Sequence, residues 1–520
     1  MRTAARTAVL MAVLTLGMKF LGFLREMFLA GFFGTSYITD AYVMGTAIPG
    51  TLFAAIFTSV GVAYLPLFSS IVEKDGKEAG MRFTNETVNL MGVVTILLSL
   101  CGIFLADVLV GFFASGFQGE TAALTAFYLR VAFFYIFFQG TASVMEAYLQ
   151  YRRVFLPQIA AGYLQGGMVL AAVVISAFTD HIYMAFGLLL GSALRMLVIW
   201  QVARRQELVL RPACRFGAAA RRILVLAVPV FIGSTVNQVN TFVDKWLASG
   251  LPEGSVSALN YGYLLVNLIV SLTVTVIVTI IYPRFAQSAA AGSMESYNDA
   301  LEKGMNIILI TGIPFSLGCM AFSDSAVELV YERGAFDGAS TALTSGAFFY
   351  YSIGISFIAL NALLSKAFYS LQDTRTPVLC GVAGALVNIG LNLLLVGPMA
   401  HRGLALASSI AAVVNSLLLY CLLRHTHKEL RVLRSRKEGG LIALAALLAV
   451  GAARLLHSLL TGGGPGAALE NALGSFLHLL FSLGLAALLA CLLYLALLKL
   501  FRIPELAFLK DVIKTKRKEK

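Results

Sequence analysis

Three charged residues lie within the first long apolar stretch of the chain. Lys19 and Glu26 are seven positions apart and share a helix face with Gly22, whereas Arg25 points about 120° away from Lys19 on an ideal helix. A charge near the bilayer centre costs at least about 2.5–3.5 kcal/mol, so these residues need a hydrated cavity or a partner. Lys19 and Arg25 can converge on one anion only if the helix bends. Gly17 and Gly22 make such a bend feasible, since glycine has no side chain to hold the turn.

Asp40 opens the second apolar stretch in the sequence Thr39-Asp40-Ala41. One interpretation is a helix N-cap, because a short carboxylate side chain readily accepts a hydrogen bond from the first helical turn. The other is an ion pair with Arg25. Both interpretations remain open from the sequence.

Other polar residues within apolar stretches have two interpretations each. Asp244, Asn388 and Asn392 offer oxygen ligands for a hard cation, although asparagine also packs helices together. Glu146 and Lys366 are candidates for a gate ion pair or for solvated loop ends.

Two arginines within spans, Arg130 and Arg195, present a similar choice. Each either forms a buried ion pair, in which Asp107 would be the partner of Arg130, or extends its head group to the membrane surface.

The composition defines the class of protein that must position these residues. Of 520 residues, 59% are hydrophobic and 13% charged, and the mean hydropathy is +0.84. Soluble domains contain about 25% charged residues, so a soluble enzyme and a disordered chain are excluded. The six cysteines are scattered without a metal-binding spacing. We attribute the net charge of +12 to basic loops that set the membrane topology rather than to a surface that binds nucleic acid.

The apolar stretches predict an all-α polytopic membrane protein with about 14 transmembrane helices. The expected spans are 8–33, 40–71, 84–114, 122–149, 156–178, 184–202, 223–248, 256–283, 304–321, 341–365, 378–396, 404–423, 438–459 and 472–498. Basic residues fall in alternate connections, and 31 of the 39 Lys and Arg lie on one side. We therefore expect both termini in the cytoplasm.

The chain contains an internal repeat at an offset near 220 residues. Glu146-Ala147-Tyr148 corresponds to Lys366-Ala367-Phe368, and Pro157 corresponds to Pro377. Six spans per repeat give both halves the same orientation, which predicts two pseudo-twofold lobes around a central cavity and transport by alternating access. The predicted domains are an N-lobe at 1–215, a C-lobe at 216–436, spans 13 and 14 at 437–500 and a basic cytoplasmic tail at 501–520.

Spans 13 and 14 lie outside the repeat and are rich in Ala, Leu and Gly. We expect them to form a groove for a lipid tail, with Gly484 and Ala487 on its inner side. The alternative is an accessory hairpin that only aids insertion or stability.

Several motifs together resemble the MviN/MurJ family of lipid II flippases, within the multidrug/oligosaccharidyl-lipid/polysaccharide exporter superfamily. They are Leu21-Gly22-Phe23-Leu24-Arg25, Thr39-Asp40-Ala41-Tyr42, Gln372-Asp373-Thr374-Arg375-Thr376-Pro377, and the Gly397-Pro398 turn before His401 and Gly403. The resemblance implies a non-enzymatic flippase for undecaprenyl-diphosphate-linked lipid II in a bacterial inner membrane, driven by membrane potential or an ion gradient. It also implies a diphosphate site formed by Lys19, Arg25, Glu26 and Asp40.

The sequence departs from the family pattern at three positions. Phe53, Ala54 and Leu264 stand where family members often have arginine, which leaves the identity of the glycan open. Alternatives are a flippase for another polyprenyl-linked glycan, such as an exopolysaccharide, a cation-coupled drug antiporter and, more distantly, a membrane glycosyltransferase.

The resemblance also implies a sodium site formed by Asp244, Asn388, Asn392 and Ser408, with Asn392 in place of a carboxylate. No other cofactor is expected. The expected partners are the glycan lipid and membrane lipids, without nucleic acid, and the expected state is a monomer.

Overall fold

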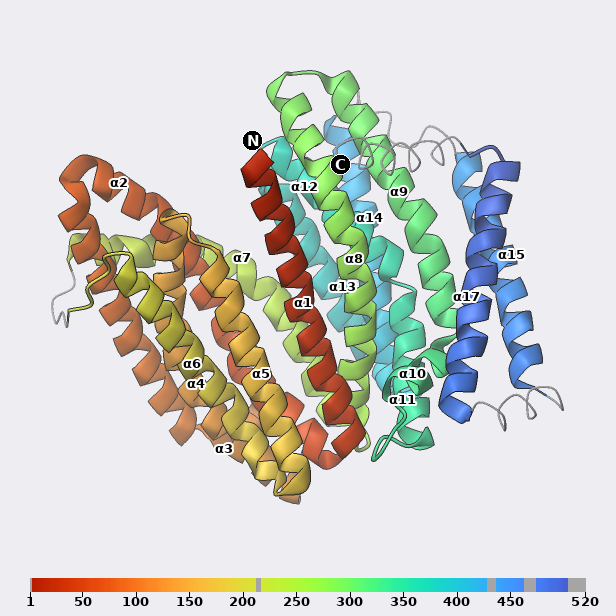
Figure 1. The fold of residues 1–520 in the computed structure, drawn as a ribbon, viewed down its shortest axis with the longest axis horizontal. Coiled ribbons are helices and arrows are strands. Elements are labelled where there is room, and N and C mark those ends of the chain that lie inside the picture. Colours follow the sequence, from red (N-terminus) through yellow and green to blue (C-terminus); the bar gives the residue numbers. More distant parts are fainter. Residues whose placement is uncertain (1, 212–216, 428–435, 463–473, 504–520) are drawn as a thin grey trace. The chain divides into compact units, whose positions relative to one another are not determined.

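The structure is a computed structural model that describes residues 2–211, 217–427, 436–462 and 474–503. Within these ranges the chain forms helices and no strands (Figure 1). The helices are α1 (Arg2–Phe33), α2 (Tyr37–Phe104), α3 (Ala106–Phe113), α4 (Gly119–Tyr151), α5 (Leu156–Phe178), the 3-10 helix η1 (His181–Tyr183), α6 (Met184–Arg205), α7 (Ala218–Ser249), α8 (Ser255–Ala290), α9 (Met294–Ala321), α10 (Ser323–Tyr331), α11 (Gly338–Ser352), α12 (Ile355–Ser370), α13 (Arg375–Met399), α14 (His401–Thr426), α15 (Arg436–Thr461) and α17 (Ser475–Leu500).

These helices account for all the predicted spans. The 68-residue α2 carries span 2 and most of span 3, which are separated at Gly76, where φ is +84°, and α3 forms the end of span 3. Span 10 is the pair α11 and α12, bent by 43°. Within the described part of the chain, nine helices are long and apolar enough to cross a membrane, or ten with the bent pair. The prediction of an all-α polytopic membrane protein is confirmed.

The chain folds into two compact units. Unit 1 comprises Met1–Ser257 and Arg333–Asp337, and unit 2 comprises Ala258–Glu332 and Gly338–Lys520. The core of unit 1 packs α1 and α2 on α4, α5 and α6 through residues such as Leu29, Tyr42 and Tyr128. The core of unit 2 packs α8, α9, α12 and α14, and a second cluster joins α15 and α17 to α9.

The ends of α4 and α12, which the repeat places in corresponding positions, have the same turn. Arg153 (φ +59°) and Gln372 (φ +62°) are left-handed residues directly after the helix caps. In each case the next amide donates to the carbonyl five residues earlier, from Val154 to Leu149 and from Asp373 to Phe368. This pattern is the Schellman motif, which satisfies otherwise open helix carbonyls.

The Gln372–Pro377 motif contains this turn and also starts α13. The Asp373 carboxylate accepts hydrogen bonds from Arg375 N at 2.9 Å, Thr376 N at 3.0 Å and Thr376 Oγ1 at 2.6 Å. These bonds stabilise the charged form, and the side-chain bond from Thr376 contributes most to holding the pKa of Asp373 below its ordinary value. The motif thus has a structural role as a helix cap in the loop between α12 and α13.

We expect Asp373→Ala to lower the unfolding free energy by about 1 kcal/mol at pH 7, as for other N-cap losses. Because the folded-state pKa is depressed, this contribution is present above the ordinary Asp pKa near 4 and is lost as the pH falls through the folded value. Unfolding of the detergent-solubilised protein at pH 7 and pH 3 measures both. Asp299→Ala, which removes only an exposed i,i+4 pair with Lys303, is the matched control. An equal cost of Asp373→Ala at both pH values would contradict the assignment.

Candidate functional site

The first helix, α1, which carries Lys19 and Arg25, is held against α5 by a close seam. The Tyr163 hydroxyl donates to Leu14 O at 2.8 Å and occupies the space that a Cβ on Gly17 would need. Farther along α1, Met18 and Leu21 pack onto Gly162 and Gly166, which are four residues apart on α5. Small residues at this spacing let two membrane helices approach closely. The seam fixes the position of α1, and therefore of its charged residues, relative to α5.

α1 runs as one helix from Arg2 to Phe33, without a break at Gly17 or Gly22. Gly17 instead makes room for the Tyr163 hydroxyl. Lys19 is exposed and the Arg25 side chain is 33% exposed. The convergence of these two cations on one anion therefore remains a prediction.

Arg25 forms an ion pair with its neighbour Glu26, and Arg25 Nε lies 3.1 Å from Glu26 Oε1. Glu26 is only 5% exposed, so the pair lies at the edge of the protein interior. Tyr42 on α2 interacts electrostatically with Arg25, and Lys245 on α7 interacts with Glu26. Lys245 is thus a second cation that interacts with Glu26 of the Arg25–Glu26 pair. Lys245 is far from α1 in the sequence, so no local pattern could have revealed this role.

Asp40 does not pair with Arg25. Its two carboxylate oxygens accept hydrogen bonds from Gly254 N at 2.8 Å and Ser257 N at 2.7 Å, at the start of α8. Asp40 is 2% exposed and therefore caps another helix from a distance, where the positive end of the helix dipole favours its charge. Neither sequence interpretation is correct, because the carboxylate caps α8 rather than its own helix and Arg25 already has Glu26.

The end of α1 is held by a further loop contact in unit 1. Ala335 N donates to Gly31 O at 2.8 Å. Gly34, with φ +60°, lies so close to the Ala335 carbonyl that a Cβ there would be 2.5 Å from its oxygen. This contact and the Asp40 bonds together anchor the α1–α2 junction.

The remaining predicted charges form pairs within unit 1 or contact rings in unit 2. Arg130 pairs with Asp107, the expected partner, at 2.5 Å, but the two side chains are 41% and 71% exposed, so the pair is not the buried one that the sequence suggested. Arg195 pairs with Glu146 at 2.8 Å, with both side chains under 20% exposed. Lys366 lies over the rings of Tyr282 and Tyr369. A gate role for Glu146 would require it to leave Arg195, and that role remains a prediction.

The residues proposed for sodium fall into two groups. Asn388, Asn392 and Ser408 lie together between α13 and α14, where Asn392 donates to Asn388 at 2.7 Å and Asn388 donates to Ser408 at 3.2 Å. In this arrangement the Asn392 amide donates to the Asn388 oxygen and the Asn388 amide to the Ser408 oxygen, and a cation site here stays a prediction. Asp244 lies on α7, in unit 1. Among the described residues, no group of three or more His, Cys, Asp or Glu could hold a metal ion.

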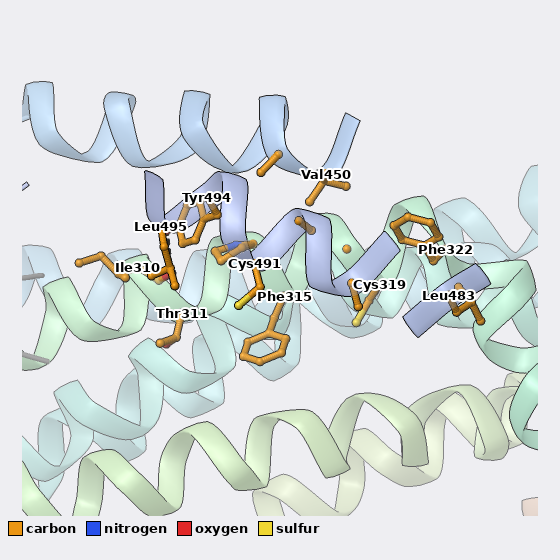
Figure 2. A pocket seen from close by; sticks show the side chains of 15 residues that line it. Ile310, Thr311, Phe315, Cys319, Phe322, Val450, Leu483, Cys491, Tyr494 and Leu495 are labelled. Carbon is orange, nitrogen blue, oxygen red and sulfur yellow. Dashed lines mark hydrogen bonds between the residues drawn. The ribbon is translucent and has the colours of Figure 1, made fainter. Parts of the chain in front are cut away.

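A cavity of about 610 Å³ lies in unit 2 where α15 and α17 meet α9. Figure 2 shows its lining, which is almost entirely apolar and includes Phe315, Cys319, Leu483, Cys491 and Tyr494. The Tyr494 hydroxyl donates to Ile310 O at 2.8 Å, which ties α17 to α9 at one end of the cavity.

The two residues singled out on span 14 differ in their relation to this cavity. Ala487 belongs to the lining, whereas Gly484 does not and has open space around it. The prediction that both face the groove is wrong for Gly484, which lies one residue after the lining residue Leu483 and so about 100° around the helix.

The α1–α5 seam predicts a compensating pair of substitutions. Gly17→Ala alone should cost about 1–3 kcal/mol of unfolding free energy, because its Cβ would collide with the Tyr163 hydroxyl. Tyr163→Phe should cost about 1 kcal/mol for the lost hydrogen bond. The double variant should be no less stable than Tyr163→Phe, since the ring Cζ lies at an ordinary 3.4 Å from the added Cβ. Gly22→Ala, with open space around its Cβ, is the matched control on α1. Additive losses in the double variant would show that the seam is absent.

Comparison with known proteins places the chain in one family. Residues 29–474 match the family model described as Lipid II flippase MurJ. A Rhizobium meliloti protein named probable lipid II flippase MurJ is 27% identical over 79% of this chain and 78% of its own length. The Burkholderia cenocepacia lipid II flippase MurJ is 26% identical over 79% and 82%.

Solved structures agree on the fold. A structure titled lipid II flippase MurJ, inward closed conformation, has a TM-score of 0.81 at 22% identity and covers 97% of this chain and 100% of that one. An inward-facing multidrug resistance MATE family transporter of the MOP superfamily has a TM-score of 0.66 at 13% identity, over 80% and 95%. Since the family model spans most of the sequence, the protein belongs to the MurJ family of lipid II flippases.

Proposed function

We propose that this protein moves lipid II, an undecaprenyl-diphosphate-linked peptidoglycan precursor, from the inner to the outer leaflet of the bacterial cytoplasmic membrane by alternating access. The observation that carries the proposal is the match of residues 29–474 to the family model. The two relatives compared above carry the same family name. The protein acts as a transporter rather than as an enzyme. Both termini lie in the cytoplasm, in accord with the distribution of Lys and Arg.

The cation cluster, by which we mean Lys19, Arg25 and Lys245, has a chemistry that supports this cargo. A diphosphate cannot cross hydrocarbon without compensating positive charge, and guanidinium binds phosphate oxygens bidentately. Arg25 is oriented by Glu26, and Lys19 and Lys245 add charges that can release the cargo, since ammonium binds phosphate as a point charge. A diphosphate would compete with Glu26 for Arg25. Asp40 belongs to the framework of the site, because its oxygens already bind the start of α8.

The energy source follows from the charge of the cargo. Outward movement of an anion is favoured by an inside-negative potential at about 2.3 kcal/mol per charge per 100 mV. Sodium coupling through Asp244, Asn388, Asn392 and Ser408 stays a proposal, for which the side-chain oxygens of these residues would be the ligands. Transport that does not depend on sodium would remove it.

The cavity between α9, α15 and α17 suits the polyprenyl tail. Its lining is apolar, and small residues such as Ala449, Ala487 and Ala490 leave room along two helices. An isoprenoid chain needs apolar contact without hydrogen bonding, which this lining provides. We assign spans 13 and 14 to holding the tail.

The diphosphate assignment is tested by complementing a strain depleted of its lipid II flippase. Arg25→Ala and Lys19→Ala should each abolish rescue at normal expression, and Arg25→Lys should be partly active at best, because lysine lacks the bidentate fork. Arg130→Ala, which removes an exposed pair with Asp107, should rescue normally. Rescue by both alanine variants would exclude the cation cluster. Failure of the wild-type chain, despite good expression, would favour another polyprenyl-linked glycan.

The tail assignment is tested by tryptophan substitutions that fill the cavity and by protection of a cysteine thiol from labelling. Ala487→Trp should reduce transport several-fold, because the ring fills the cavity, whereas Gly484→Trp should have little effect. In the wild-type protein, a long polyprenyl phosphate should protect Cys491, in the lining, from a membrane-permeant maleimide and leave the exposed Cys421 on α14 reactive. Equal effects of both tryptophans, or equal labelling of Cys491 with and without the lipid, would leave spans 13 and 14 as scaffolding.

A further inference from the structure

A second cavity, of about 400 Å³, lies at the basic end of α6 in unit 1. Its lining consists of Trp200, Gln201, Arg204 and Arg205. Trp200 is one of only two tryptophans in the chain, and tryptophan is characteristic of the membrane–water interface. The cavity therefore combines an interfacial ring with two guanidinium groups.

The charges of this cavity are not neutralised by acidic side chains. In the part of the chain that the structure describes, neither Arg204 nor Arg205 has an acidic partner within 4 Å. The nearby Glu207 is paired with Arg152 at 3.3 Å. The Arg204 guanidinium lies over the Trp200 ring, 5.9 Å from its centroid. Two positive charges thus remain available for an anion.

The backbone around the cavity is fixed. At the end of α6, Gln206 N donates to Ala203 O at 3.0 Å and Leu208 N donates to the same carbonyl. The Tyr148 hydroxyl donates to Gln206 O at 2.5 Å. The negative end of the helix dipole also favours cations in this last turn. The arginines are therefore presented from an ordered helix end rather than from a loose chain.

The connection beyond α6 is tied to α2. The Asn85 side chain donates to Val209 O at 2.8 Å and accepts from Arg211 N at 2.8 Å, which imitates the pairing of a neighbouring strand. Asn89 donates to Arg211 O at 2.9 Å. The cavity thus lies directly before an anchored stretch of the connection between α6 and α7.

We propose that this cavity binds the phosphodiester headgroup of an anionic glycerophospholipid, as a resident lipid distinct from the transported cargo. Arg205 and Arg204 bind the phosphate oxygens, since the planar guanidinium fork matches them. The Trp200 ring packs against the glycerol and upper acyl chain, and Gln201 supplies a neutral hydrogen-bonding group for the headgroup. The proposal does not rest on the proposed transport function.

The repeat provides a natural control for this site. At the offset of 220 residues, Arg204 corresponds to Arg424 at the end of α14, and Arg205 corresponds to His425. The second half therefore keeps one arginine at a basic helix end but lacks the pair. A variant at Arg424 changes the same charge at a helix end of the same kind.

Fluorescence of Trp200 measures the binding directly. In a Trp246→Phe background, Trp200 is the sole tryptophan, and phospholipids brominated on their acyl chains quench it on contact. In bilayers of phosphatidylcholine, brominated phosphatidylglycerol should quench Trp200 with an apparent affinity at least about tenfold above that of brominated phosphatidylcholine. Arg204→Gln/Arg205→Gln should bring this preference close to one, and Arg424→Gln should leave it unchanged. The single substitution Arg205→Gln, at an exposed position, should reduce the preference for phosphatidylglycerol part of the way. It replaces the double variant as the test if the double variant does not fold.

Three results would overturn the proposal. The first is equal quenching by the two lipids in the unaltered site. The second is a preference that survives loss of both arginines, or that Arg424→Gln removes to the same degree, since either shows diffuse surface charge. The third is release of phosphatidylglycerol by inorganic phosphate at constant ionic strength, which would identify a free-anion site instead of a lipid site.

Discussion

The bonding of one buried carboxylate, Asp40, holds together the part of unit 1 that carries the cation cluster. A charged carboxylate removed from water is costly unless its oxygens are satisfied, and both are used by backbone amides of Gly254 and Ser257. Gly254 has φ +83°, and a Cβ there would lie 2.6 Å from Thr35 O, so glycine is needed for the amide to reach Asp40. This constraint fixes the α1–α2 junction on the start of α8.

The cation cluster depends on that junction and on the α1–α5 seam. Arg25 and Glu26 are neighbours in sequence, so the ion pair needs no other helix to form. What the tertiary structure adds is a position at the protein interior and a third charge, Lys245, from α7. Glu26 already satisfies Arg25, so under the proposed function a diphosphate would have to take the place of this carboxylate.

The structure contains two cavities of opposite chemistry. The cavity between α9, α15 and α17 is apolar and suits an isoprenoid chain, while the cavity at the end of α6 presents two arginines and suits a headgroup. The first is built from helices outside the repeat that dock on α9 through Tyr494 and a cluster of alanines. The second is built from one helix end whose backbone is already satisfied.

The sequence alone determined the membrane class and the all-α fold, because lipid permits few backbone solutions and periodicity marks helix faces. It also offered Asp107 as the partner of Arg130, which the structure confirms for an exposed pair. The partners of Asp40 and Arg195 were decided only in three dimensions. Asp40 binds amides more than 210 residues away in the sequence, and Arg195 binds Glu146, which is 49 residues away. Helical spacing shows which side chains share a face but not which helix packs against it. Only the tertiary structure brings those partners within hydrogen-bonding distance.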